Sequence, residues 1–574
     1  MRVEGETVTV ARAAGAKMLA FLSLPSRIGK ARRRGLSPGL PARIDRYDFA
    51  AAVLFCGLVI LIALTVSQYA ISNDEEVQQR YGEMIVAYYA SGFVDQALFH
   101  FRDLYLYGGL FDVVAVGFEK IIPLDAYVVR HLLCALTGVA GIAAAWAAAR
   151  TIGGPRAGLL AAAALAVCGT WYGAMFAHTK DIPFAAAMMG ALYVLLLLAR
   201  ELPRPRWRLV LLFGVLCGCA LGIRVLGLFM IGYAGLAVLA YAPIGRGYTA
   251  SEALAFVSRS ALALAPAFVV AYAIMIAAWP WAGLAPLNPL RAITAFDNLN
   301  APINTILAGH IYRMADVPRW YVPAYVAIKL TLPLLVGSGL ALVLVMIRPQ
   351  VTPSAGKSWR SEVILTSIAA FLPLVCAVVA HTPADTGMRH FLFTVPPIAV
   401  LAGLGFDGVF RRMEALNRLA AAAGLAIVLP GLCWNAATLY RLHPEEYLFF
   451  NALVGGLEGA SRRFATDYWV NIMPEAVDDL ERFLDRDERA SRKPFLHRYL
   501  VAVCGERLPF EKKADARLKW TRDWDHADFF IAPTHMNCDR ALDGQVVATV
   551  ERLGVLIGVV KDRRALVSSH LAHK

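Results

Sequence analysis

Charged side chains are scarce in this chain. Asp, Glu, Lys and Arg make up 17% of its 574 residues, whereas a typical soluble domain contains about 25%. Hydrophobic residues make up 58% of the chain, and the mean hydropathy is +0.55. This balance excludes an ordinary soluble protein and predicts a polytopic α-helical membrane protein.

Metal-binding cysteine patterns are also missing. The nine cysteines form no CxxC pair and no Cys/His spacing of the kind that holds zinc. Seven of them lie in apolar segments, and only Cys504 and Cys538 lie in the polar C-terminal part. In an oxidising compartment these two can pair, but the sequence leaves this open. No internal repeat and no cleavable signal peptide is recognisable.

Long apolar runs occupy most of the chain instead. A membrane-spanning helix needs about 20 mainly apolar residues. Eleven segments are candidates: 49–70, 127–149, 157–177, 183–200, 208–223, 226–243, 260–282, 324–347, 362–380, 391–410 and 419–438. They predict a basic N-terminal segment (1–48), a membrane domain (49–440) and a C-terminal domain (441–574).

The net charge of +13 is concentrated at particular places, which argues against nucleic acid as a partner. Ten Lys and Arg residues precede the first apolar run. By the positive-inside rule this predicts a cytoplasmic N-terminus, and an odd number of spans then places the C-terminal domain outside. We expect a multi-pass protein of the bacterial inner membrane whose C-terminal domain is periplasmic.

The outer loops of this topology contain most of the residues that can do chemistry. The first outer loop, 71–126, has two amphipathic, aromatic-rich stretches that predict helices lying in the membrane interface. The tail has a helical pattern at 475–488 and strand patterns near 494–504, 527–535 and 544–561. These predict a small α/β domain outside the membrane.

The stretch "NDEE" (73–76) follows the first apolar run directly. Asp74 and Glu75 fit a solvated helix start, where acids favour the positive end of the helix dipole. They also fit a general base at the lip of a cavity, because partial burial raises the pKa of a carboxylate. The sequence alone does not decide between these interpretations.

A short outer turn, "HTKDIPFA" (178–185), lies between two long apolar runs. Asp181 is explained completely as a helix N-cap, because a proline follows in the first turn. Lys180 is not explained in this way. Its ammonium at the membrane surface, beside a helix N-terminus and His178, predicts a site for a phosphate.

Arginine and histidine introduce a late apolar run in "MRHFLFTVPP" (388–397). Arg389 and His390 fit either side chains that reach the interface from a helix end or an arginine that donates two hydrogen bonds to a phosphate. Arg224, between two apolar runs, invites the same two interpretations because charge at membrane depth is costly. The 283–323 loop adds residues suited to a sugar or a lipid headgroup: His310, Tyr312, Arg313, Trp320 and Tyr321.

The order of these three motifs resembles that of the GT-C glycosyltransferases. The similarity covers roughly residues 49–440, and it is greatest to the branch (glycosyltransferase family 39) of protein O-mannosyltransferases and of the lipid A aminoarabinose and galacturonic acid transferases. Residues 451–476 also resemble a stretch of bacterial members with a C-terminal extension. The large inserted domain of eukaryotic protein mannosyltransferases is missing.

The resemblance implies an inverting transfer of a sugar from a polyprenyl-phosphate donor, with no cofactor required. Asp74 matches the catalytic acid of the family, Glu75 is its neighbour, and Lys180 and Asp181 match the second outer-loop motif. Arg389 matches a basic residue near the donor phosphate. A divalent metal shared by Asp74 and Asp181 is an alternative. The sugar and the acceptor, whether glycan, lipid or protein, stay open.

Two other classes of protein fit parts of the pattern. A transporter or flippase of a lipid-linked or anionic substrate would place polar residues near the bilayer midplane, whereas these lie at span ends. A membrane scaffold whose tail binds a partner would not need the acids and cations. We expect the glycosyltransferase.

Overall fold

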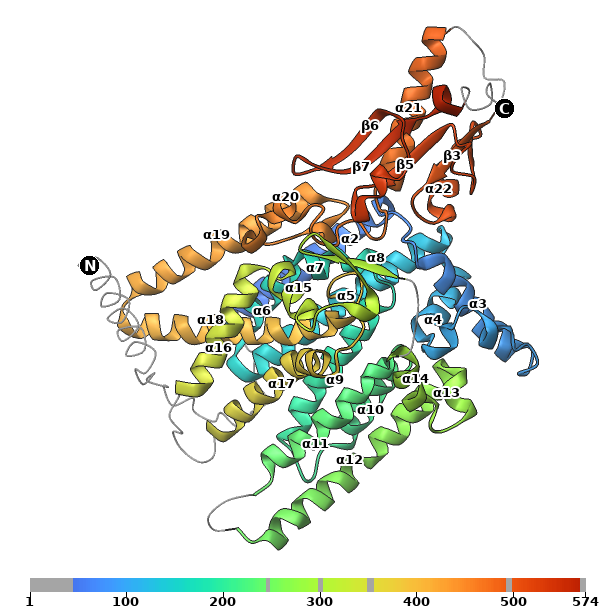
Figure 1. Cartoon of the computed structure of the whole chain (residues 1–574). Helices are drawn as coiled ribbons and strands as arrows, with labels where there is room; N and C mark the ends of the chain where they lie inside the picture. Colours follow the sequence, from blue (N-terminus) through green and yellow to red (C-terminus); the bar gives the residue numbers. More distant parts are fainter. Residues whose placement is uncertain (1–44, 244–247, 298–302, 348–355, 492–497, 568–574) are drawn as a thin grey trace.

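The computed structural model describes residues 45–243, 248–297, 303–347, 356–491 and 498–567. The basic segment predicted for residues 1–48 lies outside this part of the chain, apart from its last four residues. A large helical portion carries a smaller domain with a sheet at one end (Figure 1). The protein therefore has the predicted combination of a helical membrane domain and a C-terminal α/β domain.

All eleven predicted apolar segments are helical. By length and composition, seven helical stretches in the described residues can cross a membrane, or nine if two bent pairs each count as one span. The seven contain α2 (Arg46–Thr65), α5 (Ala126–Gly153), α9 (Asp181–Ala199), α12 (Ala250–Ala278), α17 (Gly356–Ala380), α18 (Val395–Leu416) and α19 (Arg418–Leu442).

The other apolar helices are broken or short. One bent pair joins α6 (Pro155–Ala166) to the short helices α7 (Gly169–Tyr172) and α8 (Ala174–Ala177) at 67°. The second joins α15 (Tyr321–Lys329) to α16 (Leu332–Ile347) at 110°. The two short apolar helices are α10 (Trp207–Leu221) and α11 (Phe229–Tyr241). The count of eleven crossings therefore stays a prediction.

Small residues allow the central helices to pack closely around α18. A Cβ on Gly405 would lie 2.0 Å from the carbonyl oxygen of Gly337 on α16, and one on Gly403 would lie 2.4 Å from the carbonyl oxygen of Ala157 on α6. Any side chain at these positions would push the helices apart. The hydrophobic effect contributes little to association between helices in lipid, so close backbone packing of this kind is what drives it.

Basic residues at one set of helix ends are held by ion pairs. Arg150 of α5 pairs with Asp48 of α2 at 2.7 Å, and Arg156 of α6 pairs with Asp407 of α18 at 2.7 Å. Arg200, which follows α9, pairs with Glu362 of α17. These are ends that the sequence assigns to the inner face. The side of the membrane that they face stays a prediction.

The first outer loop folds onto the start of α5. Its two main helices, α3 (Glu75–Ala90) and α4 (Leu110–Glu119), pack against each other, and both predicted helices are confirmed. Buried Arg130 of α5 donates to Asp112 of α4 at 2.6 Å and to Gln79 of α3 at 2.9 Å. This network fixes the helix pair on the membrane domain.

The tail begins as an irregular segment and continues as the predicted α/β domain. Helix α21 (Met473–Ser491) precedes a five-stranded sheet of order β4-β3-β5-β7-β6. Strands β3 (Tyr499–Val503) and β5 (Phe529–Pro533) are parallel neighbours, and β6 (Gln545–Arg552) and β7 (Val555–Asp562) form an antiparallel pair. The expected helix and strands are confirmed, while the short strand β4 (Leu518–Trp520) was not foreseen.

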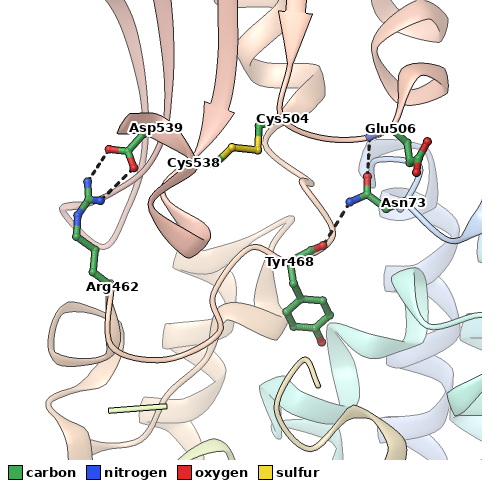
Figure 2. Close-up of a disulfide and its surroundings, with 7 residues drawn as sticks. All are labelled: Asn73, Arg462, Tyr468, Cys504, Glu506, Cys538 and Asp539. Carbon is green, nitrogen blue, oxygen red and sulfur yellow. Dashed lines mark hydrogen bonds and ion pairs between the residues drawn. A yellow bond between two sulfur atoms is a disulfide. The ribbon is translucent and has the colours of Figure 1, made fainter. Parts of the chain in front are cut away.

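A disulfide joins Cys504, directly after β3, to Cys538, after β5 (Figure 2). It settles the pairing that the sequence left open. Close by, the backbone N–H of Glu506 donates to the side chain of Asn73 at 3.2 Å, and Asn73 donates to the Tyr468 carbonyl at 3.4 Å. The sheet domain is thus tied to the chain that leads into α3.

We expect Cys504→Ser to destabilise the C-terminal domain. The bridge closes a loop across 34 positions, and a loop of this size corresponds to roughly 3–4 kcal/mol through the unfolded state. Denaturant unfolding followed by tryptophan fluorescence measures the loss. Cys433→Ser, at an exposed free cysteine, is the matched control. Equal unfolding midpoints for the two variants would contradict the expectation.

Candidate active site

A guanidinium between two carboxylates forms the centre of the site. Nη2 of Arg389 lies 2.5 Å from Oδ2 of Asp74, and its Nε lies 3.0 Å from Oδ2 of Asp181. The other oxygen of Asp181 pairs with Arg224. These four residues come from four separate places in the chain, so the structure unites three motifs and an isolated arginine. We call them the Asp74–Arg389 cluster.

Each member of this cluster lies at a helix end. Asp74 directly precedes α3, Asp181 is the first residue of α9, and Arg389 is the first residue of the 3-10 helix η6 (Arg389–Thr394), which leads into α18. Arg224 lies between α10 and the 3-10 helix η4 (Val225–Leu228). Because each of the four charges lies at a helix end, four loops can bring them together while every helix stays unbroken.

The two carboxylates differ in exposure. The side chain of Asp74 is 42% exposed, whereas that of Asp181 is 3% exposed. The N-cap assignment for Asp181 is wrong, because Lys180 occupies the N-cap position and makes no capping bond there. Asp181 instead lies in the first turn and neutralises two arginines. Asp74 is the carboxylate that an external group can reach.

Lys180 is buried rather than free at the surface, which corrects the expectation for its ammonium. Its Nζ lies 4.1 Å from the centre of the Tyr107 ring, and the guanidinium of Arg224 lies 5.7 Å from the same ring. No carboxylate of the described residues lies within 4.0 Å of this ammonium. Burial lowers the pKa of Lys180 to about 8, although Asp112 opposes the shift.

Of the two histidines, His178 contacts the Asp74–Arg389 cluster, and His390 contacts Asp385. His178 shares a hydrogen bond of 3.0 Å between Nε2 and the Tyr468 hydroxyl, and its Nδ1 lies 3.8 Å from Asp181. Burial lowers the pKa of His178 to about 3, so the ring is neutral at pH 7. His390 lies 3.7 Å from Asp385. His178 therefore contributes hydrogen bonding to the site, not charge.

Glu75 does not lie at the lip of a cavity, which corrects both interpretations of "NDEE" for this residue. Its side chain is fully buried and contacts Nε2 of His131 at 2.9 Å. The same carboxylate accepts from the backbone N–H of Ser72 at 2.6 Å. Glu75 thus anchors the start of α3 and fixes the position of Asp74 beside it.

Three of the residues proposed in the 283–323 loop lie on a hairpin of β1 (Asn304–Leu307) and β2 (His310–Arg313), whereas Trp320 and Tyr321 lie at the start of α15. His310 and Arg313 are exposed, and Tyr312 is half-buried. In the described part of the chain, none of the three hydrogen-bonds to or ion-pairs with the Asp74–Arg389 cluster. The structure therefore does not bring them into the cluster.

The same loop helps to position Arg389 through a different residue. The hydroxyl of Tyr321 forms a 2.6 Å hydrogen bond with Thr305 on the hairpin. It also accepts from the backbone N–H of Gly387, two residues before Arg389, at 2.9 Å. Tyr321 is thus a link between the hairpin and the segment that carries the guanidinium.

Two aromatic residues from the tail complete the site, and the sequence assigned them no role. The guanidinium of Arg389 lies 4.3 Å from the centre of the Trp469 ring, and Tyr468 bonds to His178. Both lie in "TDYWVN" (466–471), inside the 451–476 stretch whose resemblance to family members was the available signal. The tail therefore covers the cationic centre.

A narrow pocket beside Arg389 holds a further buried cation, Lys329. The pocket has a volume of about 10 Å³, enough for roughly one water molecule. Thr170 of α7, in one bent helix pair, donates to the carbonyl of Lys329 of α15, in the other, at 2.6 Å. The pocket therefore lies between the two bent pairs. Its lining is Thr170, His178, Lys329, Thr386, Met388, Arg389, Leu392, Tyr447 and Tyr468.

Lys329 escaped the sequence analysis because it stands alone in an apolar run. Its ammonium donates to the carbonyl of Tyr447 at 2.6 Å and lies 4.0 Å from the centre of the Phe450 ring.

As for metals, the described residues contain no group of three or more His, Cys, Asp and Glu side chains that could hold an ion.

Comparison with known proteins gives one family match. Residues 118–274 match the family of dolichyl-phosphate-mannose-protein mannosyltransferases. This range contains Lys180, Asp181 and Arg224, and it includes the second of the three motifs on which the resemblance to GT-C glycosyltransferases is based. No curated protein sequence matches the chain significantly.

Two solved structures with similarity to this chain are the following. ArnT from Cupriavidus metallidurans, bound to undecaprenyl phosphate, is 16% identical and has a TM-score of 0.47, with 89% of this chain and 98% of ArnT covered. The oligosaccharyltransferase AglB from Archaeoglobus fulgidus, in complex with an inhibitory peptide and a dolichol-phosphate, is 12% identical. Its TM-score is 0.43, with 84% of this chain and 70% of AglB covered.

We expect Asp181→Asn to lower the thermal stability of the detergent-solubilised protein much more than Asp74→Asn. Removing the buried carboxylate leaves two arginines without their shared partner, and breaking such a buried pair costs about 3–5 kcal/mol. Asp74 is half-exposed and contributes less to stability, because water can solvate the Arg389 guanidinium in place of its carboxylate. Melting temperatures of both variants test this difference. Equal losses would contradict the distinct roles of the two carboxylates.

Proposed function

We propose that this protein is a membrane glycosyltransferase that moves a sugar from a polyprenyl-phosphate donor to an acceptor hydroxyl and inverts the anomeric centre. The observation that carries the proposal is the exposed carboxylate of Asp74 held against Arg389, with further cations around it. The family match supports a donor of the dolichyl-phosphate-sugar type. Arg389 and Lys180 are the groups that we assign to the donor phosphate.

Asp74 is the base in this proposal because its carboxylate is accessible. An acceptor hydroxyl must approach within about 2.6–3.2 Å of the group that takes its proton. Asp181 is enclosed by two arginines and Glu75 by His131 and Ser72. Asp181 therefore serves to hold the arginines, and Glu75 serves to position Asp74.

A bound donor adds a negative charge beside the cluster. Within the Asp74–Arg389 cluster the two carboxylates offset the two arginines, and the ammonium of Lys180 lies next to Arg224 on the same Tyr107 ring. A sugar linked to a lipid through a phosphodiester carries one negative charge, which this ammonium neutralises. Preorganised cations around the leaving phosphate are an effective way to stabilise the charge that develops there.

Proton transfer and bond cleavage support each other in this arrangement. The acceptor oxygen attacks the anomeric carbon from the face opposite the phosphate, and the carbon–oxygen bond to the phosphate breaks with its electron pair on the phosphate. The hydroxyl proton passes to Asp74, which becomes neutral while the phosphate gains a second negative charge. Neutral Asp74 no longer holds Arg389, whose guanidinium is then available to the departing phosphate.

The placement of these charges favours an enzyme over a transporter. A translocation path needs polar residues near the middle of the spans, whereas the cluster lies at helix ends. The disulfide in the tail favours an oxidising compartment. We therefore assign the site and the C-terminal domain to the periplasmic face of a bacterial inner membrane.

Asp74→Asn should slow sugar transfer strongly and preserve donor binding. General-base catalysis contributes roughly 10²–10⁴-fold, so the release of free polyprenyl phosphate from labelled donor should slow by that factor. Membrane extract supplies the acceptor. Glu76→Gln is the control, because Glu76 pairs with Arg80 outside the cluster. If a folded Asp74→Asn variant released polyprenyl phosphate at the wild-type rate, Asp74 would not be the base.

The KM for the donor should rise as the pH increases through about 8. Burial lowers the pKa of Lys180 to this value, so its ammonium is charged below pH 8 and loses its proton above it. Loss of one proton weakens binding by at most about tenfold per pH unit. Lys180→Arg, whose guanidinium stays charged, should remove this pH dependence. The same rise in the variant would exclude Lys180 as the phosphate-binding cation.

A further inference from the structure

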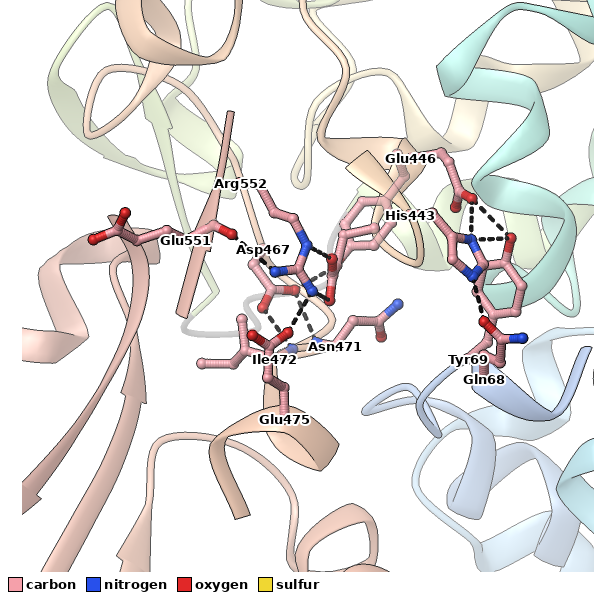
Figure 3. A network of polar contacts seen from close by, with 12 residues as sticks. Gln68, Tyr69, His443, Glu446, Asp467, Asn471, Ile472, Glu475, Glu551 and Arg552 are labelled. Atoms are coloured by element: carbon pink, nitrogen blue, oxygen red, sulfur yellow. Dashed lines mark hydrogen bonds and ion pairs between the residues drawn. The ribbon is translucent and has the colours of Figure 1, made fainter. Parts of the chain in front are cut away.

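Residues 462–472 contact both the membrane domain and the sheet domain, and we call this stretch the strap. It leads directly into α21. Asp467 is fully buried in its middle, and its carboxylate accepts from the backbone N–H groups of Asn471 at 2.9 Å and Ile472 at 3.2 Å (Figure 3). The hydroxyl of Tyr447, shortly after α19, donates to the same carboxylate. The shape of the strap is therefore set from the membrane domain.

The sheet domain holds the start of the strap. Arg462 donates to the carboxylate of Asp539 through two nitrogens, at 3.0 Å and 2.7 Å (Figure 2). Asp539 follows Cys538 directly, and the disulfide joins this point to Cys504, directly after β3. The start of the strap is thus fixed to a cross-linked part of the sheet domain.

The other end of the same disulfide lies close to the middle of the strap. Two positions after Cys504, Glu506 donates its backbone N–H to the side chain of Asn73 at 3.2 Å. Asn73 in turn donates to the carbonyl of Tyr468 at 3.4 Å (Figure 2). Because Asn73 directly precedes Asp74, one side chain links the sheet domain, the strap and the proposed base.

The backbone of the strap is strained directly after Trp469. Val470 has a φ of 58°, a left-handed conformation that a β-branched residue rarely adopts. Strain of this kind persists only where the surrounding structure enforces it, and it is frequent at functional sites. Val470 is buried, and a Cβ on Gly505 would lie 3.2 Å from its side chain. The loop after β3 therefore packs on the strained residue and keeps the turn in place.

The strap presents two aromatic side chains to the cationic centre. Trp469 is 3% exposed, and the centre of its ring lies 4.3 Å from the guanidinium of Arg389 and 5.3 Å from the centre of the His178 ring. The hydroxyl of Tyr468 hydrogen-bonds to Nε2 of the same histidine at 3.0 Å. One segment of the tail thus holds two side chains of the membrane domain.

The carboxylates and the ring control different aspects of the Arg389 guanidinium. Asp181 engages Nε and Asp74 engages Nη2, while Nη1 hydrogen-bonds to none of the described residues. The N–H groups of a guanidinium lie in its plane, whereas the Trp469 ring covers one of its faces. Exclusion of water from that face strengthens the attraction between the cation and an anion. Nη1 is then the nitrogen available for an oxygen of the donor phosphate.

The ring becomes more important during the proposed reaction. Once Asp74 takes the acceptor proton, the guanidinium of Arg389 keeps two of these three contacts, Asp181 and Trp469. The ring over its face then holds the guanidinium in place while charge develops on the departing phosphate. A cation that is already oriented needs no reorganisation at that moment, which is the basis of electrostatic catalysis.

We propose that Trp469 and Tyr468 are positioning residues of the transferase, and that the docked C-terminal domain is therefore part of its active centre. The strap orients Arg389 and His178 for the donor phosphate. The inference rests on the proposed glycosyltransferase function and adds these residues to it. A tail that only recruited an acceptor would leave the affinity for a bare polyprenyl phosphate unchanged, so the two roles can be separated.

The test is binding of undecaprenyl phosphate to the full-length protein in detergent. Trp469→Leu should raise the Kd about tenfold, the order of a desolvated cation–π contact. Trp469→Phe keeps a ring over Arg389 and should restore most of the affinity. Trp520→Leu is the matched control, because the Trp520 ring lies 5.4 Å from the guanidinium of Arg507 elsewhere in the C-terminal domain. Melting temperatures verify that the variants are folded.

Arg462→Gln tests the strap without a change inside the site. It releases the strap from Asp539, so that Trp469 and Tyr468 are held less firmly. The Kd for undecaprenyl phosphate should rise in the same direction as in Trp469→Leu, by a smaller factor. The side chain of Arg462 is 30% exposed, so this variant should fold even if Trp469→Leu does not.

Equal Kd values for the wild type, Trp469→Leu and Arg462→Gln would overturn the proposal and leave the transferase in place. An equal rise in Trp520→Leu would also overturn it, because the loss would then come from the domain as a whole. No binding of undecaprenyl phosphate by the wild type would remove the donor of the proposed function, and the positioning role with it. The two failures are thus distinct.

Discussion

The structure depends on the guanidinium of Arg389, which is held by Asp74 on one side and Asp181 on the other. A cation enclosed at this depth is tolerated only with its partners in place, because an unpaired buried charge is strongly destabilising. The first outer loop, the start of α9 and the start of η6 must therefore converge. Trp469 closes this centre with its ring over the guanidinium, which brings the tail to the same point.

The fold could be predicted because hydropathy determines much of it. Apolar runs of about 20 residues have few alternatives to helices in a membrane, and the period-two patterns of the tail gave its strands. The breaks were not predicted. The 110° bend between α15 and α16 lies in an apolar run that contains Lys329 and Pro333. Proline disfavours a continuous helix at this point, and Lys329 beside the bend is bonded to Tyr447 and Thr170.

The site could be predicted only in part, for a geometric reason. Three motifs contributed residues to the cluster, but successive helical residues point about 100° apart. Asp74 consequently faces Arg389, while Glu75 faces His131 inside the protein. Long-range pairs left no local signal either: Asp74 and Arg389 are 315 positions apart. Trp469 and Lys329 belong to the site because of folding alone, so no spacing rule could find them.

The central claim is that Arg389 and Lys180 bind the phosphate of a polyprenyl carrier. A cryo-EM structure of the protein in lipid nanodiscs with added undecaprenyl phosphate tests it most directly. The account predicts phosphate oxygens within hydrogen-bonding distance of the Arg389 guanidinium and the Lys180 ammonium. A phosphate bound elsewhere, with Arg389 and Lys180 making no contact to it, would contradict the account.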